Sequence, residues 1–238
     1  MNVKKIITFM VLAVNTSGLF AQYFLGLGLC KPGYSTTSSL TEANFTYKMG
    51  TGIEASLLLE KERFFVESKL FYYVNTAEVD YYFDPGPSTP TYHLVIDNEH
   101  IDPVRSFGGS IAAAVYLLPK TLFFRAGVGG MSTSYFSFTE EGYYVPTSGS
   151  GAKDAFKEEL TSSRTFAGGL ILGSGLRMEI KHRVRILFNL DYLFFGGSPK
   201  IKYIQTSGSN VSDQYDRSVS MRFFFLSVGA TALYRIHN

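Results

Sequence analysis

The chain of 238 residues contains 22 basic and 20 acidic residues, 16% aromatic residues and no tryptophan. Its nearly balanced charge gives no basic footprint of the kind that binds nucleic acid, so nucleic acid is not an expected partner. The single cysteine, Cys30, excludes an internal disulfide.

The first 21 residues have the order of an export signal. Lys4 and Lys5 precede an apolar run over residues 6–14, and small residues follow up to Ala21. This run is too short to span a bilayer. We expect a signal peptide over residues 1–21, cleaved after Ala21, and one domain over residues 22–238. Removal of the two lysines leaves 20 basic and 20 acidic residues.

A first strand is expected over residues 22–34, where apolar and small residues alternate, and a polar loop over 35–44 follows it. The next two segments, residues 45–60 and 64–77, alternate with the period of two that strands show. A hairpin closed on Lys61 and Glu62 would pair residues whose numbers sum to 123. This register predicts Glu54 opposite Lys69 on one face and the apolar residues, including Ile53 and Leu70, on the other.

Five more strands are expected, over residues 104–118, 121–136, 163–180, 184–195 and 218–236. Tight turns separate some of them, at Pro119-Lys120 and at residues 181–183. Prolines, glycines and polar residues predict long loops from about 78 to 103, over 137–162 and over 196–217. A single helical turn is expected at residues 153–160.

Loops and tight turns therefore alternate along the chain, which places every tight turn at one end and every long loop at the other. Outer-membrane barrels sort their connections in this way, with short periplasmic turns and long extracellular loops. No later stretch has the roughly 20 consecutive apolar residues of a transmembrane helix. The sequence predicts an all-β fold: an eight-stranded antiparallel up-and-down transmembrane β-barrel in the bacterial outer membrane.

The segment 227–234 resembles the C-terminal targeting signal of outer-membrane barrels, with a polar residue, a glycine and alternating apolar positions that end in Tyr234. Four residues, 235–238, follow it. The stretches 52–73 and 104–131 also resemble the small porin-like outer-membrane β-barrel family, which includes PorT-like proteins and barrels of the OmpA-OmpX type. This resemblance implies the barrel fold, and for some members a part in protein secretion.

The polar face of the expected strands carries charges of both signs. An eight-stranded barrel has an interior that side chains just fill, so we expect these charges to pair in a buried network that fixes the strand register. A narrow path for ions or protons is the alternative. The expected interior charges are Lys48, Glu54, Glu67, Lys69, Arg125, Arg177, Glu179, Arg185, Asp191 and Arg235.

Other charged residues are expected outside the barrel. Arg105, Arg164 and Arg222 would lie just above the apolar band, where guanidinium groups can pair with lipid phosphates; solvation in water is the alternative. His93 and His100 lie among acidic residues of an expected loop. Their spacing matches no metal or catalytic motif, so no catalytic residue, cofactor or metal is predicted.

These observations predict a non-enzymatic integral outer-membrane protein whose barrel anchors surface loops, in envelope integrity, adhesion or a secretion complex. The expected partners are outer-membrane lipids, including lipopolysaccharide, and envelope or secretion-complex proteins. Two alternatives stay open: a soluble lipocalin-like carrier, and an outer-membrane lipid hydrolase or protease that uses His93 and His100.

Overall fold

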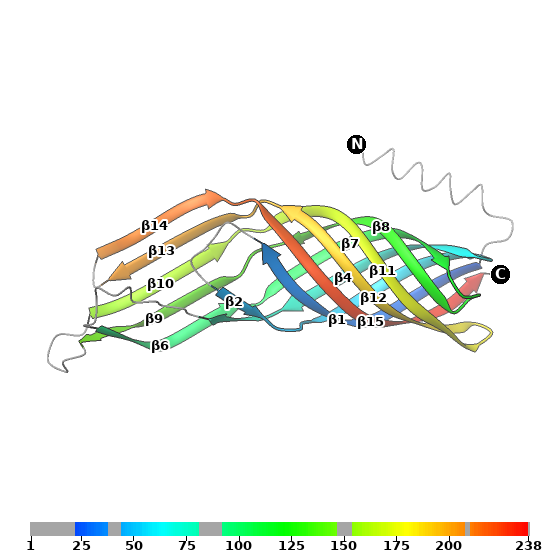
Figure 1. Cartoon of the computed structure of the whole chain (residues 1–238), viewed down its shortest axis with the longest axis horizontal. Helices are drawn as coiled ribbons and strands as arrows, with labels where there is room; N and C mark the ends of the chain where they lie inside the picture. The colour runs from blue at the N-terminus through cyan, green and yellow to red at the C-terminus, as the bar shows by residue number, and fades with distance from the viewer. Residues whose placement is uncertain (1–21, 38–43, 81–91, 147–153, 208–209, 238) are drawn as a thin grey trace.

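The computed structural model describes residues 22–37, 44–80, 92–146, 154–207 and 210–237. These residues form a closed barrel and a second sheet that projects from one end of it (Figure 1). The expected signal peptide, residues 1–21, lies outside the described residues.

Eight strands close the barrel, and each is antiparallel to both of its neighbours, which confirms the predicted up-and-down fold. The order around the barrel follows the chain, and β1 closes it by pairing with the last strand. The barrel strands are β1 (Gln22–Thr37), β3 (Thr51–Lys61), β4 (Phe64–Asn75), β7 (Val104–Tyr116), β8 (Leu122–Thr133), β11 (Thr165–Lys181), β12 (Val184–Gly197) and β15 (Met221–His237).

Hydrogen-bonded partners can be followed once around the barrel, and they define how far its strands are staggered. A path from Thr37 on β1 returns to β1 at Leu27, a displacement of ten residues, through Arg222, Gly196, Gly168, Gly130, Gly109, Leu70 and Ala55. Such a stagger tilts the strands by about 35–45° and leaves an interior that side chains can fill.

Strict alternation along the barrel strands separates an apolar outer face from a mixed inner face. On β12, the side chains of Phe188 and Leu190 are exposed while those of Leu187 and Asp191 are buried. Ile53 and Leu70 are also exposed, at 59% and 57%, and Glu54 and Lys69 are buried. The predicted assignment of the two faces is therefore confirmed.

The register of the first hairpin differs from the prediction. The observed partners in β3 and β4 have numbers that sum to 125, as in Lys61 and Phe64, so the turn lies at Glu62 and Arg63. Glu54 is opposite Phe71, and Lys69 is opposite Ser56. The observed pairing thus differs from the predicted pairing by two residues. Because side chains alternate between the faces with a period of two, every side chain stays on its predicted face.

The three long loops predicted after residue 77 were wrong for the residues described. Most of these residues form the strands of a second, five-stranded sheet, here called the extension sheet, in the order β14-β13-β10-β9-β6. The expected helical turn at 153–160 is likewise a strand from residue 154 onward. The strands are β6 (Tyr92–Asp102), β9 (Ser137–Pro146), β10 (Asp154–Ser162), β13 (Lys200–Ser207) and β14 (Asn210–Ser218).

The extension sheet continues the barrel wall on one side. Strand β6 leads into β7 after Pro103, and β14 leads into β15 after residues 219 and 220. The tight turns that end β3, β7 and β11 lie at the opposite end of the barrel, where β15 also ends (Figure 1).

The short strands β2 (Asn44–Tyr47) and β5 (Ala77–Asp80) pair with each other and precede and follow the β3–β4 hairpin. The expected single strand over residues 45–60 is thus divided in two. Its break includes Lys48 and Gly50, and the backbone N–H of Gly50 donates to the carbonyl of Pro32 on β1.

Candidate functional site: a filled barrel with a projecting sheet

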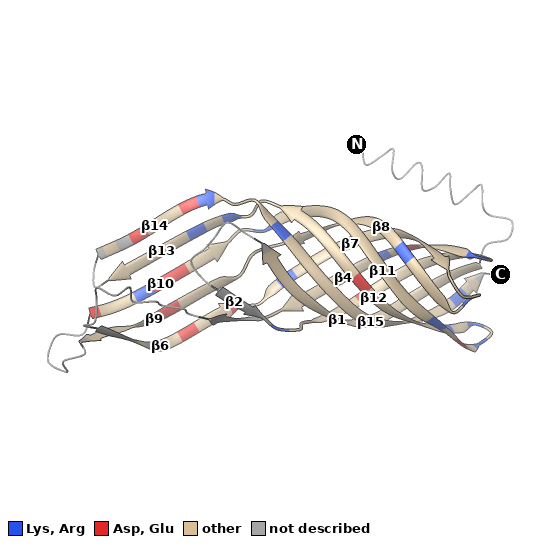
Figure 2. Cartoon of the chain, in the orientation of Figure 1, with Lys and Arg blue, Asp and Glu red and all other residues tan. Residues whose placement is uncertain are grey.

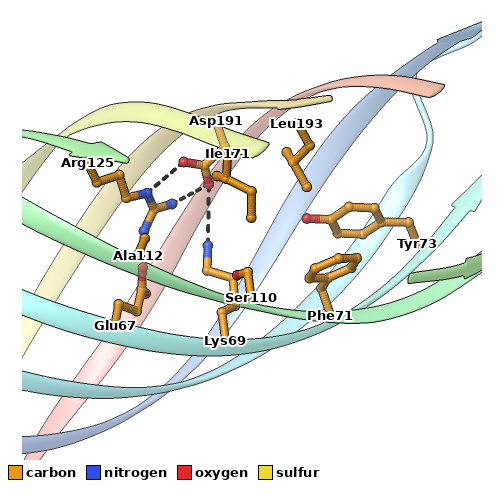
Figure 3. Close-up of a pocket in the computed structure, with 10 residues that line it drawn as sticks. All are labelled: Glu67, Lys69, Phe71, Tyr73, Ser110, Ala112, Arg125, Ile171, Asp191 and Leu193. Atoms are coloured by element: carbon orange, nitrogen blue, oxygen red, sulfur yellow. Dashed lines mark hydrogen bonds and ion pairs between the residues drawn. The ribbon is translucent and has the colours of Figure 1, made fainter. Parts of the chain in front are cut away.

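A cluster of charged side chains crosses the middle of the barrel interior (Figure 3). Arg125 on β8 donates from Nε to Oδ1 of Asp191 on β12 at 2.7 Å, and a second nitrogen contacts the other carboxylate oxygen. Its remaining amino group contacts Glu67 on β4. Each of these three side chains is at most 6% exposed, so Arg125 joins two walls of the barrel away from water.

Two further charges complete this central cluster. Lys69 Nζ lies 2.7 Å from Oε2 of Glu54 and 3.4 Å from Oδ2 of Asp191. The hydroxyl of Tyr73 donates to Oε1 of Glu54 at 3.0 Å. The cluster therefore links β3, β4, β8 and β12, and the predicted partners Glu54 and Lys69 meet as a diagonal rather than a directly opposed pair.

Gly173 on β11 leaves the room that the central cluster needs. A Cβ atom at this position would lie 2.2 Å from Oδ1 of Asp191 and 3.1 Å from Nε of Arg125. The cavity beside the cluster has a volume of about 10 Å³. That volume holds at most about one water molecule. The polar groups at the barrel centre are thus packed against each other rather than around a channel.

A second charged cluster closes the barrel near the tight turns. Its centre is Glu60 on β3, whose two carboxylate oxygens contact Arg177 on β11 and Arg185 on β12. The hydroxyl of Tyr116 donates to Oε1 of Glu60 at 2.8 Å, and Gln22 accepts from Arg185 at 3.2 Å. Glu60 is 4% exposed, so one buried carboxylate holds two buried arginines.

Sequence reasoning left Glu60 out of the interior charges because it lies at the end of the expected strand, in the charged run that surrounds the turn. The alternation that puts Glu54 and Ser56 inside the barrel continues to Leu58 and Glu60, and this pattern could have identified it.

Apolar layers separate and cover the two charged clusters. One layer contains Phe24, Leu58, Phe65, Phe123 and Leu187, all at most 1% exposed. Arg185 Cζ lies 4.2 Å from the centre of the Phe24 ring, so this layer packs directly on the second cluster. A larger apolar core fills the end of the barrel next to the extension sheet. It continues onto that sheet through residues such as Phe138 and Tyr203.

Three of the predicted interior charges are less buried than expected. Lys48 is exposed and lies between β2 and β3, outside the barrel strands, so its predicted place in the interior was wrong. Glu179 lies at the rim, with its side chain 46% exposed and 3.4 Å from Arg177. Arg235 is half-buried, and its Cζ lies 5.6 Å from the centre of the Phe24 ring.

The outer face of the barrel carries a broad apolar surface. On β12 alone the exposed apolar positions run from Phe188 to Phe194, and the alternation begins at Val184. Eleven residues from Val184 to Phe194 match the 9–11 that a tilted strand needs to cross a bilayer. The residues described by the structure form no helix that is long and apolar enough to span a membrane.

The three arginines predicted to contact lipid phosphates are all exposed. Arg105 is on β7, Arg222 is on β15, and Arg164 directly precedes β11. Each lies beyond the apolar positions of its strand on the side toward the extension sheet, near Phe107, Phe224 or Phe166. The structure thus brings a cation to this edge of the apolar surface on β7 and β15 and directly before β11.

The extension sheet carries the two histidines of the enzyme alternative. His93 and His100 both lie on β6 rather than in a loop. Nε2 of His100 lies 3.4 Å from Oδ1 of Asp102, and both side chains are more than 60% exposed. Within the described residues, no three His, Cys, Asp or Glu side chains gather closely enough to hold a metal ion. Among the described residues of β6, the imidazole of His100 therefore lies near one solvent-exposed carboxylate, that of Asp102.

No protein-family model matches the chain, and no curated protein matches it in sequence. Solved structures do. Neisserial surface protein A is 13% identical, with 89% of this chain and 97% of that chain covered and a TM-score of 0.40. OprG from Pseudomonas aeruginosa is 11% identical, with coverages of 92% and 98% and a TM-score of 0.45.

A major outer membrane protein from Thermus thermophilus is 12% identical, with 91% of this chain and 99% of that chain covered and a TM-score of 0.45. At these scores the likeness is approximate. The barrel assignment rests on the strand pairing of the chain itself.

Proposed function

We propose that this chain is a non-enzymatic integral protein of the bacterial outer membrane, whose barrel anchors the extension sheet at the cell surface. The observation that carries the proposal is the reversed distribution of polarity: the barrel exposes leucine, isoleucine and phenylalanine and buries arginine, lysine and glutamate. Water as surrounding solvent would make this distribution unfavourable, whereas a bilayer favours it. The tight turns then face the periplasm and the extension sheet faces outward.

A soluble lipocalin-like carrier would need an apolar cavity inside its barrel. The interior of this barrel is occupied by two charged clusters and the apolar layers packed on them. A carrier would also bury the side chains that this barrel exposes. The distribution of side chains therefore favours the membrane protein over the carrier.

Leu190→Arg tests the proposed membrane location. Leu190 lies within the apolar stretch of β12 and is 46% exposed, so an arginine there would enter the bilayer core. We expect it to destabilise the inserted barrel by about 2–4 kcal/mol. The measurement is the urea dependence of the heat-modifiable gel mobility of protein folded into phosphatidylcholine vesicles.

Val95→Arg is the matched control for this test. Val95 is 44% exposed, but it lies on β6 in the extension sheet, which the proposal places in water. This substitution should leave the stability unchanged. Equal stability of both variants and the native protein would contradict the membrane location, since a water-exposed leucine can be replaced by arginine at little cost.

The proposed biological role depends on the extension sheet, which the barrel holds outside the membrane. The described barrel interior is filled with side chains, so the extension sheet is the part that offers a surface to partners. We propose roles in adhesion, envelope integrity or a secretion complex, with outer-membrane lipids and envelope proteins as partners.

The contact with lipids is proposed to involve lipopolysaccharide phosphates at Arg105, Arg164 and Arg222. Each basic residue near an anionic lipid surface contributes about 1 kcal/mol. Replacing all three with glutamine should lower the lipopolysaccharide that remains bound after detergent extraction severalfold, as measured by phosphate per barrel. Replacing Arg63, Lys120 and Arg183 at the tight turns with glutamine is the control, and equal loss in both variants would refute a specific contact.

A further inference from the structure

The extension sheet is open at both sides, unlike the barrel. Among the strands that the structure describes, β6 and β14 are its two edges, and each pairs with one neighbour only. An edge strand offers unpaired backbone N–H and C=O groups to another strand. The two edges are therefore candidate interaction surfaces.

The direction of these edge strands limits how two copies could pair. Strand β6 runs into β7 and β14 runs into β15, so both edges run toward the barrel (Figure 1). Two copies in one membrane have the same orientation, so their edges could meet only in parallel. Two copies in facing membranes have opposite orientations, and their edges would meet antiparallel, which is the slightly more stable pairing.

The two edges differ in charge. Strand β6 contains Asp97, Glu99 and Asp102 and no lysine or arginine, so two copies of it would repel each other. Strand β14 contains charges of both signs, as Figure 2 shows, with Asp213, Asp216 and Arg217 exposed. Of the two described edges, only β14 can therefore pair with its own copy through opposite charges.

One antiparallel register of β14 with itself is complementary. When Tyr215 is opposite Tyr215 of the second copy, Asp213 of each copy is opposite Arg217 of the other, because both pairs of numbers sum to 430. Asp213, Tyr215 and Arg217 are alternate residues, so they share one face of the strand. The symmetric pairing thus forms two ion pairs around an aromatic pair.

Contacts within each copy already hold the Tyr215 and Arg217 side chains on this face of β14. Tyr215 stacks on Tyr203 of β13, with ring centres 5.1 Å apart and an angle of 19° between the rings. Arg217 Cζ lies 4.8 Å from the centre of the Tyr215 ring. Pairing would therefore extend an ordered aromatic row across the junction, and cross-strand aromatic pairs stabilise sheets.

We infer that β14 is a homophilic docking edge that joins two copies of this protein in facing membranes by antiparallel strand pairing. The inference rests on the proposed function, because it requires the barrel in a membrane and the extension sheet outside. One edge of this length gives a weak contact, and many copies on each surface make the attachment strong by multivalency. The partner of the extension sheet is thus another copy on a neighbouring cell.

The test uses full-length protein inserted into preformed phosphatidylcholine vesicles. Flotation and heat-modifiable gel mobility first show whether the barrel is inserted. Two vesicle populations that carry different fluorophores are then mixed, and energy transfer between them reports bridging. We expect the native protein to bridge vesicles in proportion to its density, and protein-free vesicles to stay apart.

Charge reversal tests the register. Asp213→Arg alone or Arg217→Asp alone turns both ion pairs into repulsions, so each should lower bridging within its own population about tenfold. Mixing vesicles of these two variants should restore bridging, because each strand then faces opposite charges on the other. Asp97→Arg on β6 changes the charge by the same amount as Asp213→Arg and should leave bridging unchanged.

The outcomes separate this inference from the proposed function. Failure of the protein to insert would refute the membrane proposal. Insertion without bridging, or reversal variants that bridge as the native protein does, would refute the docking edge alone. Loss of bridging that the mixture does not restore would also refute it, since the predicted register requires that restoration.

Discussion

Replacing Arg125 with methionine is expected to lower the free energy of unfolding by about 3–5 kcal/mol. Arg125 is the cation that contacts both Glu67 and Asp191, and all three side chains are buried. Its removal leaves three carboxylates, those of Glu54, Glu67 and Asp191, with Lys69 as the nearby cation. The large effect comes from burying charge without its partner rather than from the strength of the original pair.

Two variants make this prediction specific. Arg63→Met changes the same residue type in an exposed turn and should be neutral within about 0.5 kcal/mol. Combining Arg125→Met with Glu67→Gln and Asp191→Asn removes the uncompensated charge and should recover at least half of the lost stability. Urea unfolding in detergent micelles, followed by circular dichroism, measures all of them. A triple variant no more stable than the single one would refute the electrostatic explanation.

Replacing Glu60 with glutamine is expected to destabilise the barrel by about 3 kcal/mol. Glu60 accepts from Arg177 and Arg185, and the other nearby carboxylate, Glu179, is 3.4 Å from Arg177 at the rim. Glutamine keeps the size of the side chain but leaves two buried cations close together. The same urea series measures the effect.

Glu62→Gln is the control for this second prediction. Glu62 lies two residues further along in the exposed turn, so its substitution should change the stability by less than about 0.5 kcal/mol. Equal effects at both positions would mean that the buried contacts of Glu60 do not contribute. The two clusters lie at different depths, so their effects should add in a variant that combines Arg125→Met and Glu60→Gln.

The sequence predicts the faces of the barrel strands better than their register. The outward and inward sets of β3 and β4 follow from alternation alone, and they stay correct although the predicted turn was misplaced. The contact between Glu54 and Lys69 persists at 2.7 Å because long side chains reach a diagonal neighbour. Which charges pair across the barrel, such as Arg125 with Glu67, depends on closure and stagger, which no local pattern contains.

The extension sheet was predicted as loops because its strands lack the apolar alternation of the barrel strands. Along β9, Glu140 occupies an inward position between Phe138 and Gly142, and Glu141 lies on the other face. Across the sheet, Glu140 is directly opposite Glu99 on β6 and Glu158 on β10. Polar residues on both faces resemble a loop in sequence, and it is continuity with the barrel strands that orders them.

The pairing of β1 with β15 also determines the order in which the protein can be completed. Tyr23 pairs with His237, so closure joins the two ends of the described chain. Every other barrel pair forms between barrel strands that are consecutive along the chain, but this one cannot form until β15 is in place. Before that moment β1 and β12 both have open edges, and the buried arginines and glutamates lack a sealed interior. A barrel without β15 therefore presents two open sheet edges, which favour pairing with other chains, and β15 closes both of them at once.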